Sequence, residues 1–235
     1  CDIGSIFLWF KYQGKTFLFL TLYNISNVYV SLSMIFLDSF GIFINGIFKL
    51  FYTDPRPFWR NPELVPCGCA TNYGNPSTTS LDEFLVCIVI FRALINRHKN
   101  IFWKILIWIA FLTPQVLAWT SRFIQNIHSL PQLCFGVTIG YIIQYIYFEI
   151  LEVNMEDSSQ LKKLINKKSF YLIVISVIFT WGIVNSLHYL LFTEPDNTSY
   201  LTNINKYCDS SVEFFMFGNE SYQKAAKAFL FLGSI

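Results

Sequence analysis

Long apolar stretches are the feature that most constrains the fold of this chain. Four of them are bounded by polar residues, at 81–96, 101–120, 130–151 and 169–193. Each is close to the roughly 20 apolar residues that a helix needs to cross a bilayer. Only 14% of the residues are charged, whereas a soluble domain carries about 25%. The sequence therefore predicts an all-α, polytopic membrane protein whose main partner is the lipid bilayer.

The two ends of the chain are less regular than its middle. Residues 16–52 form a nearly continuous apolar run that is too long for one straight span. We expect this run to turn back as a hairpin near Asp38, and an amphipathic piece up to about Leu20 is the alternative. A further apolar helix begins at about residue 225. We therefore expect about six to seven spans in residues 1–235, a single multi-pass membrane domain that is a fragment of a longer protein.

Basic clusters and glycosylation sequons indicate the orientation. The clusters NRHKN at 96–100 and QLKKLINKK at 160–168 are expected on the cytoplasmic side. The sequons at Asn197 and Asn219 lie in the following loop, which helix parity puts in the lumen, where glycosylation takes place. The net charge of +2 gives no reason to expect nucleic acid as a partner. The expected luminal loops are 53–80, 121–129 and 194–223.

The six cysteines do not predict a disulfide framework. Cys87 and Cys134 fall within apolar stretches, where a free thiol is ordinary core packing. Cys67, Cys69 and Cys208 lie in loops, and the C-x-C spacing of the first two differs from that of the usual zinc site. We expect neither a metal ion nor a cofactor.

Three polar pieces fall on the expected luminal side, and their residue types suit a phosphate ester. KLFYTDPRP carries Lys49 and Arg56, and SRFIQNIHSLPQ carries Arg122 and His128. One ammonium group and two guanidinium groups can hold phosphate oxygens. NYGNPSTTS places Ser77 just before an expected helix, where backbone N–H groups can bind the same anion. A histidine among them can attack phosphorus and form a phosphohistidine that water hydrolyses.

Each piece alone has a simpler explanation. Lys49 and Arg122 could extend to lipid head groups, and Ser77 could serve only as a helix N-cap. His128 could be an ordinary interfacial histidine. The order of the three pieces, all on one side of the membrane, favours a phosphate site. A multi-pass transporter would instead pair charged residues in mid-membrane, and the predicted spans are nearly free of them.

The three pieces resemble the signature of the phosphatidic-acid-phosphatase-type superfamily, which reads K-x6-R-P, P-S-G-H and S-R-x5-H-x3-D. Lys49–Pro57 is similar to the first part throughout, and Ser121, Arg122 and His128 are similar to the third at its spacing. The third part of the signature ends in Asp, but this chain has Gln132 there. The glucose-6-phosphatase and dolichyl-diphosphatase branches resemble this chain in having Gln at that position. The resemblance implies a membrane helical bundle with His128 as the nucleophile, Lys49, Arg56 and Arg122 as the phosphate clamp, and Ser77 in an amide cradle.

Between these branches, the chain is more similar to glucose-6-phosphatase. KLFYTDPRPFW and SRFIQNIHSLPQ resemble that family strongly, and the late stretch NKYCDSS and most of the remaining chain resemble it loosely. The resemblance implies a glycoprotein of the endoplasmic reticulum membrane that acts in gluconeogenesis. It would hydrolyse glucose 6-phosphate in the lumen, and a sugar-phosphate transporter would be its partner. Dolichyl diphosphatase is the alternative, because YGNPSTTS resembles its Y-G-M-P-S-S-H-S.

The second part of the signature departs from the family at a reactive position. Thr79 stands where P-S-G-H has its proton-donating histidine, and Thr78 stands at the glycine. A threonine hydroxyl cannot protonate an alkoxide near neutral pH, and a general acid contributes about 10²- to 10⁴-fold to a rate. We therefore expect slow turnover, or a family member that binds phosphate without hydrolysing it.

Overall fold

The described part of the chain is helical, without any strand, which confirms the all-α fold class. The computed structural model describes residues 28–70, 72–95, 97–150 and 198–208, together with scattered residues between 168 and 187. The elements are α2 (Val28–Tyr52), α3 (Pro57–Arg60), α4 (Thr78–Ile95), α5 (Ile101–Ile124), α6 (Leu130–Tyr145), the π-helical turn η1 (Ile146–Ile150) and α9 (Thr198–Tyr207).

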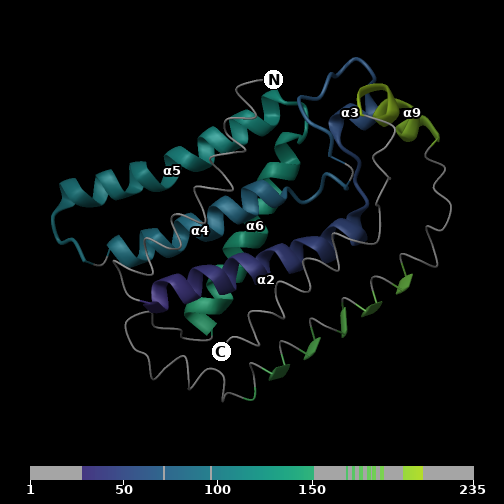
Figure 1. Cartoon of the computed structure of the whole chain (residues 1–235). Coiled ribbons are helices and arrows are strands. Elements are labelled where there is room, and N and C mark those ends of the chain that lie inside the picture. The colour runs from purple at the N-terminus through teal and green to yellow at the C-terminus, as the bar shows by residue number, and fades with distance from the viewer. Residues whose placement is uncertain are drawn as a thin grey trace.

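Three segments of the described residues are long and apolar enough to cross a membrane. They are Ser33–Arg60, Ile101–Ile124 and Leu130–Ile150. The shorter helix α4 carries Asp82, Glu83 and Arg92 and packs against α2, α5 and α6 (Figure 1). Helices α4, α5 and α6, the last with η1, account for the described residues of the predicted spans 81–96, 101–120 and 130–151. The predicted span at 169–193 lies largely outside the described residues, and Asn197, Asn219 and the predicted helix from residue 225 lie outside them. Thr198 and Ser199, which complete the first sequon, begin α9.

Asp38 lies in the middle of a helix rather than in a turn. Helix α2 is unbroken over Val28–Tyr52, so the predicted hairpin near Asp38 is wrong. The nearby Gly41 serves packing: a Cβ added there would lie 2.3 Å from Leu85 Cδ1 and 2.9 Å from Leu81 Cδ2. The glycine thus lets α2 approach α4 closely, and a single polar residue in an apolar run does not break the helix.

The core of the bundle lies between α2, α4 and α6. Its most buried side chains are Met34, Leu37, Leu81, Leu85 and Val89, all fully buried. Helix α5 turns an apolar face outward, because Ile105, Trp108, Leu112 and Val116 are exposed. In a bilayer such a face contacts lipid, so the helices are held together by close packing rather than by exclusion of water.

Two glycines of α6 allow that close packing beside the polar end of the bundle. Gly136 and Gly140 stand four residues apart, a spacing typical of membrane helices whose backbones approach closely. A Cβ added to Gly136 would lie 2.5 Å from the carbonyl oxygen of Ser77, and one added to Gly140 would lie 2.9 Å from Phe84 Cδ1. Helix α6 is therefore held against the first turns of α4.

A disulfide joins Cys69 to Cys208 across 139 residues, so the expectation of no disulfide is wrong for this pair. It fastens α9 beside α3, at one end of the bundle (Figure 1). Trp59 and Ile204 are buried in the contact, and Asn203 Nδ2 donates to the carbonyl oxygen of Trp59 at 2.7 Å. The pairing depends on this docking of two distant segments, which cysteine spacing does not encode.

Replacing Gly136 by Ala should destabilise the folded chain by about 1–3 kcal/mol, a typical cost of overpacking. The Ser77 carbonyl is backbone and has little freedom to move away from the added methyl group. Gly46→Ala is the matched control, because an added Cβ there meets nothing within 4 Å. That change should be neutral or stabilise α2 by up to about 1 kcal/mol. Thermal unfolding of the full chain in detergent measures both variants, and equal losses would contradict the packing role.

Candidate active site

The polar ends of α2, α4, α5 and α6 meet at the end of the bundle where α3 and α9 lie (Figure 1). Lys49 is in the last turn of α2, and Arg56 immediately precedes α3. Arg122 is in the last turn of α5, and His128 lies in the short link between α5 and α6. Ser77 immediately precedes α4. The structure thus brings the three sequence pieces together from segments far apart in the chain.

Arg56 and His128 contact each other directly. Arg56 Nη1 lies 3.2 Å from His128 Nε2 and donates to the carbonyl oxygen of Ile127 at 3.1 Å. The other side of the guanidinium group is held by Asn72, whose carbonyl oxygen accepts from Nε at 2.8 Å and whose Oδ1 accepts from Nη2. Arg56 is 3% exposed and His128 is 4% exposed, so both are shielded from water.

Lys49 is the second buried cation of this cluster, with 4% of its surface exposed. Its Nζ donates to the carbonyl oxygen of Tyr73. Adjacent carbonyls of one loop, those of Asn72 and Tyr73, therefore accept from Arg56 and Lys49 respectively. A charged side chain can be buried in this way only where its N–H groups donate to hydrogen-bond acceptors. Phosphate oxygens are stronger acceptors of the same kind, so both cations can hold a phosphate group.

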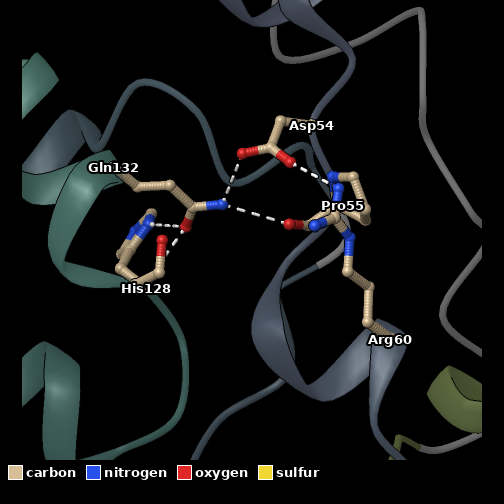
Figure 2. Close-up of polar contacts among 6 residues, drawn as sticks. Asp54, Pro55, Arg60, His128 and Gln132 are labelled. Carbon is tan, nitrogen blue, oxygen red and sulfur yellow. Dashed lines mark hydrogen bonds and ion pairs between the residues drawn. The ribbon is translucent and has the colours of Figure 1, made fainter.

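Gln132 connects the His128 ring to Asp54 and Pro55 by hydrogen bonds (Figure 2). Gln132 Nε2 donates to Asp54 Oδ2 at 2.9 Å and to the Pro55 carbonyl at 3.0 Å, which fixes the orientation of the amide. Its Oε1 then faces His128 Nδ1 at 3.3 Å and can only accept, so Nδ1 carries the proton. Nε2 is left with a lone pair, which accepts from Arg56. A neutral ring whose Nε2 carries no proton is the form of histidine that acts as a nucleophile.

The electrostatics of the cluster favour the same neutral form. Burial is the largest cause that lowers the pKa of His128 well below its ordinary value of 6.5. The positive charges of Arg56 and Lys49 lower this pKa further, and that of Arg122 does so least. The hydrogen bond to Gln132 acts in the opposite direction. The ring is therefore neutral at pH 7.

The turn that opens α4 is tied to its neighbours on two sides. The N–H of Ser77 donates to the Gln132 carbonyl at 3.0 Å, and Ser77 Oγ accepts the N–H of Ser80 at 3.4 Å, as an N-cap does. This cap is why α4 begins at Thr78, one turn before the expected start. Thr78 Oγ1 donates to Asn45 Oδ1 at 2.9 Å. Thr79 lies in the first turn of α4 and is 8% exposed.

Arg122 is the peripheral member of the predicted clamp. Its side chain is half-buried, and Nη1 donates to Gln125 Oε1 at 3.3 Å. Its carbonyl oxygen accepts the N–H of His128 at 3.4 Å, so its backbone also shapes the link before α6.

Sequence reasoning missed three polar residues at this end of the bundle. Asp54 fixes the Gln132 amide, Asn72 fixes the Arg56 guanidinium group, and Asn45 holds the turn of Ser77 through Thr78. Asp54 lies within the motif KLFYTDPRP, and its position two residues before Arg56 was the available signal. Asn45 stands four residues before Lys49 in a helix and hence on the same face, which was also readable. Nothing in the sequence singles out Asn72.

Removing one of the positive charges near His128 should raise the pKa of His128, and the rise should be larger for the charge that lowers this pKa more. Arg56→Gln should therefore raise this pKa more than Arg122→Gln does, because Arg56 is the larger of the two causes. In the unchanged protein the ring should remain neutral well below pH 6.5. An NMR titration of isotope-labelled histidine measures the pKa, and the His128 signal is identified by its loss in His128→Gln. Protonation of His128 near pH 6.5 in the unchanged protein would contradict the buried, cation-lined site.

Comparison with known proteins agrees with this geometry. A family model described as the PAP2 superfamily matches residues 26–156, more than half of the chain, and the matched range contains Lys49, Arg56, Ser77, Arg122 and His128. Searches of curated proteins and of solved structures found no significant match. The chain belongs to the PAP2 superfamily, a family of phosphatases with a membrane helical-bundle fold.

Proposed function

We propose that this chain is a membrane phosphohydrolase that passes a phosphoryl group from a phosphate ester to His128 and then to water. The observation that carries the proposal is the neutral, buried His128, whose Nε2 lone pair faces Arg56 at 3.2 Å. The lowered pKa of this ring keeps it neutral, and Nε2 without a proton, at physiological pH. Membership of a phosphatase superfamily supports the same reaction.

The reaction proceeds in two displacements at phosphorus. His128 Nε2 donates its lone pair to phosphorus, the bond from phosphorus to the ester oxygen breaks with its electron pair on that oxygen, and the alkoxide leaves and takes a proton from water. Water then attacks the phosphorus of the phosphohistidine, the bond from phosphorus to Nε2 breaks and returns the lone pair to Nε2, and phosphate is released while the proton lost by the attacking water goes to solvent. Lys49 and Arg56 stabilise the negative charge on the phosphoryl oxygens in both steps, and such charge stabilisation supplies most of the catalysis in phosphoryl transfer.

The substrate proposed is a sugar phosphate, glucose 6-phosphate, as the glucose-6-phosphatase motifs imply. The position of the site supports a luminal reaction in the endoplasmic reticulum. The disulfide between Cys69 and Cys208 lies at the same end as the site, and disulfides persist in oxidising compartments. The basic link around Arg97 joins α4 to α5 at the opposite end, as expected of a cytoplasmic loop. Asn197 and Asn219 would be glycosylated, and a sugar-phosphate transporter would supply the substrate.

Thr79 favours a second candidate substrate, a polyprenyl diphosphate. A sugar alkoxide leaves slowly unless a general acid protonates it, and Thr79 occupies the place of that acid. A leaving phosphate group has a second pKa of about 6 and needs no such proton. Cleavage of a diphosphate would therefore tolerate Thr79 better than cleavage of a sugar phosphate. A further alternative is a family member that binds phosphate through its cationic side chains and does not hydrolyse the ester.

The nucleophile is tested by trapping the phosphoryl group on the protein. The full chain, incubated with radiolabelled glucose 6-phosphate or radiolabelled pyrophosphate and then denatured, should carry a label that acid removes and alkali does not. His128→Gln should abolish the label. His98→Gln is the matched control, because His98 lies in the link between α4 and α5, away from the site. Label retained in His128→Gln would overturn the assignment.

The proton donor is tested by restoring a histidine at position 79. Thr79→His should raise the rate of glucose 6-phosphate hydrolysis about tenfold or more, because it returns a general acid to the leaving oxygen. The same change should have little effect on p-nitrophenyl phosphate, whose phenolate leaves without a proton. Thr79→Gln, of similar size and unable to act as an acid, should give no gain. Equal gains on both substrates, or no gain in a folded Thr79→His protein, would contradict this account.

A further inference from the structure

We propose that Asp54 is a positioning residue for His128 that acts through the side-chain amide of Gln132. The inference rests on the proposed function, in which His128 is the nucleophile. The signature S-R-x5-H-x3-D has a carboxylate four residues after the histidine, and this chain has the amide of Gln132 at that position. A carboxylate, that of Asp54, accepts a hydrogen bond from this amide. Asp54, Gln132 and His128 thus form a hydrogen-bonded series, here called the Asp54 relay (Figure 2).

The relay decides which ring nitrogen of His128 carries the proton. An amide has a donating and an accepting end, and the two ends are nearly equal in size, so an amide alone can turn either way. Asp54 Oδ2, at 2.9 Å, accepts only, and together with the Pro55 carbonyl at 3.0 Å it holds the donating end. The accepting end is then left for His128 Nδ1 and for the N–H of Ser129, at 3.3 and 3.2 Å. If the amide turned over, its N–H group would face Nδ1, the ring proton would move to Nε2, and the lone pair facing phosphorus would be lost.

The surroundings are shaped to hold this amide. Gln132 is 2% exposed, so water does not compete for its hydrogen bonds. Gly74 packs against it so closely that a Cβ there would lie 2.6 Å from Gln132 Nε2 and 2.7 Å from Oε1. The N–H of Gly74 also donates to the Asp54 carbonyl at 2.8 Å. The same glycine therefore positions Asp54 and makes room for Gln132.

The backbone before Asp54 is strained in a way that serves this contact. Thr53 has a φ of 46°, a left-handed conformation that is a clear outlier for a β-branched residue. Such conformations persist where the surrounding structure imposes them, often at functional sites. Thr53 lies between the end of α2 and Asp54. The unfavourable backbone conformation is therefore found immediately before the residue that contacts Gln132.

The outer oxygen of Asp54 is held as well. Arg60 Nη2 lies 2.9 Å from Asp54 Oδ1, which leaves Oδ2 for Gln132. In an Asp54→Asn variant, Arg60 would still claim the oxygen of the new amide. The amide nitrogen would then face Gln132 Nε2, and two donors would meet. That conflict weakens the hold on Gln132, although the side chain at position 54 keeps its shape.

The relay can be restored by exchanging its amide and carboxylate. In the double variant Asp54→Asn with Gln132→Glu, the amide nitrogen at position 54 donates to the carboxylate at position 132. The other carboxylate oxygen accepts from His128 Nδ1, so the ring proton stays on Nδ1. The Pro55 carbonyl loses the donor that it has at 3.0 Å, so recovery should be large but incomplete. Gln132→Glu alone would place two carboxylates in contact, and it should be worse than the double variant.

The first readout is the ring proton itself, measured without substrate. In the full chain, with histidine labelled for nitrogen NMR, the unchanged protein should show His128 as a single neutral form protonated on Nδ1. Asp54→Asn should shift the ring toward a mixture that includes the form protonated on Nε2, and the double variant should return it. Glu63→Gln is the matched control: it removes an exposed carboxylate from the loop that follows α3 and should leave the ring unchanged.

The second readout is the rate with p-nitrophenyl phosphate, which does not need the acid missing at position 79. Asp54→Asn should lower kcat about tenfold or more, since a carboxylate that acts directly on a catalytic histidine is worth up to about 10⁴-fold and this one acts through an amide. KM should change much less, because Lys49 and Arg56 still hold the phosphate group. The double variant should recover much of kcat, and Glu63→Gln should keep it.

The two readouts separate failure of the relay from failure of the proposed function. An unchanged ring proton and an unchanged kcat in Asp54→Asn would overturn the relay, even if His128 is phosphorylated. The expected changes in the ring proton, in a protein that never forms a phosphohistidine, would support the relay and overturn the proposed function. If Asp54→Asn does not fold, the Gln132→Glu variant is compared with the double variant instead. The double variant should then have the higher kcat and the larger share of His128 protonated on Nδ1. Equal values in the two variants would overturn the relay.

Discussion

Two buried cations, Lys49 and Arg56, are the constraint on which the polar end of this bundle depends. A buried positive charge is tolerated only where its donors meet acceptors, and here the acceptors are backbone carbonyls of the loop at Asn72 and Tyr73. The carbonyl of Ile127 adds a third and ties in the link before α6. The cations therefore draw together loops that are far apart in the sequence, and they leave His128 Nε2 beside a guanidinium group.

The helices supply this cluster with a rigid frame. Small residues on facing helices, Gly41 of α2 and Gly136 of α6, let both helices pack closely on α4. The turn that opens α4 is consequently fixed against α6 through the contact of Ser77 with Gln132. At the outer side, the disulfide between Cys69 and Cys208 fastens α9 over α3. The packed helix ends thus hold in place the short links that carry Arg56 and His128.

Much of this architecture could be predicted from the sequence. Apolar length located the helices, and motif spacing predicted that Lys49, Arg56 and His128 share one end of the bundle. Hydropathy could not separate a long helix from a hairpin near Asp38, because both bury the same apolar residues. The disulfide and Asn72 depend on how distant segments dock, which spacing does not record. The position of Asp54 beside Arg56 marks it as a candidate in the sequence, but its role depends on its contact with Gln132, which spacing does not record either.

The central claim is that His128 presents Nε2, and not Nδ1, to phosphorus. Phosphorus NMR of the denatured phosphoprotein, compared with the two synthetic phosphohistidine isomers, tests it most directly. The hydrogen bond from Nδ1 to Gln132 and the contact of Nε2 with Arg56 predict phosphate on Nε2 alone. Phosphate found on Nδ1, or on a residue other than His128, would contradict the account.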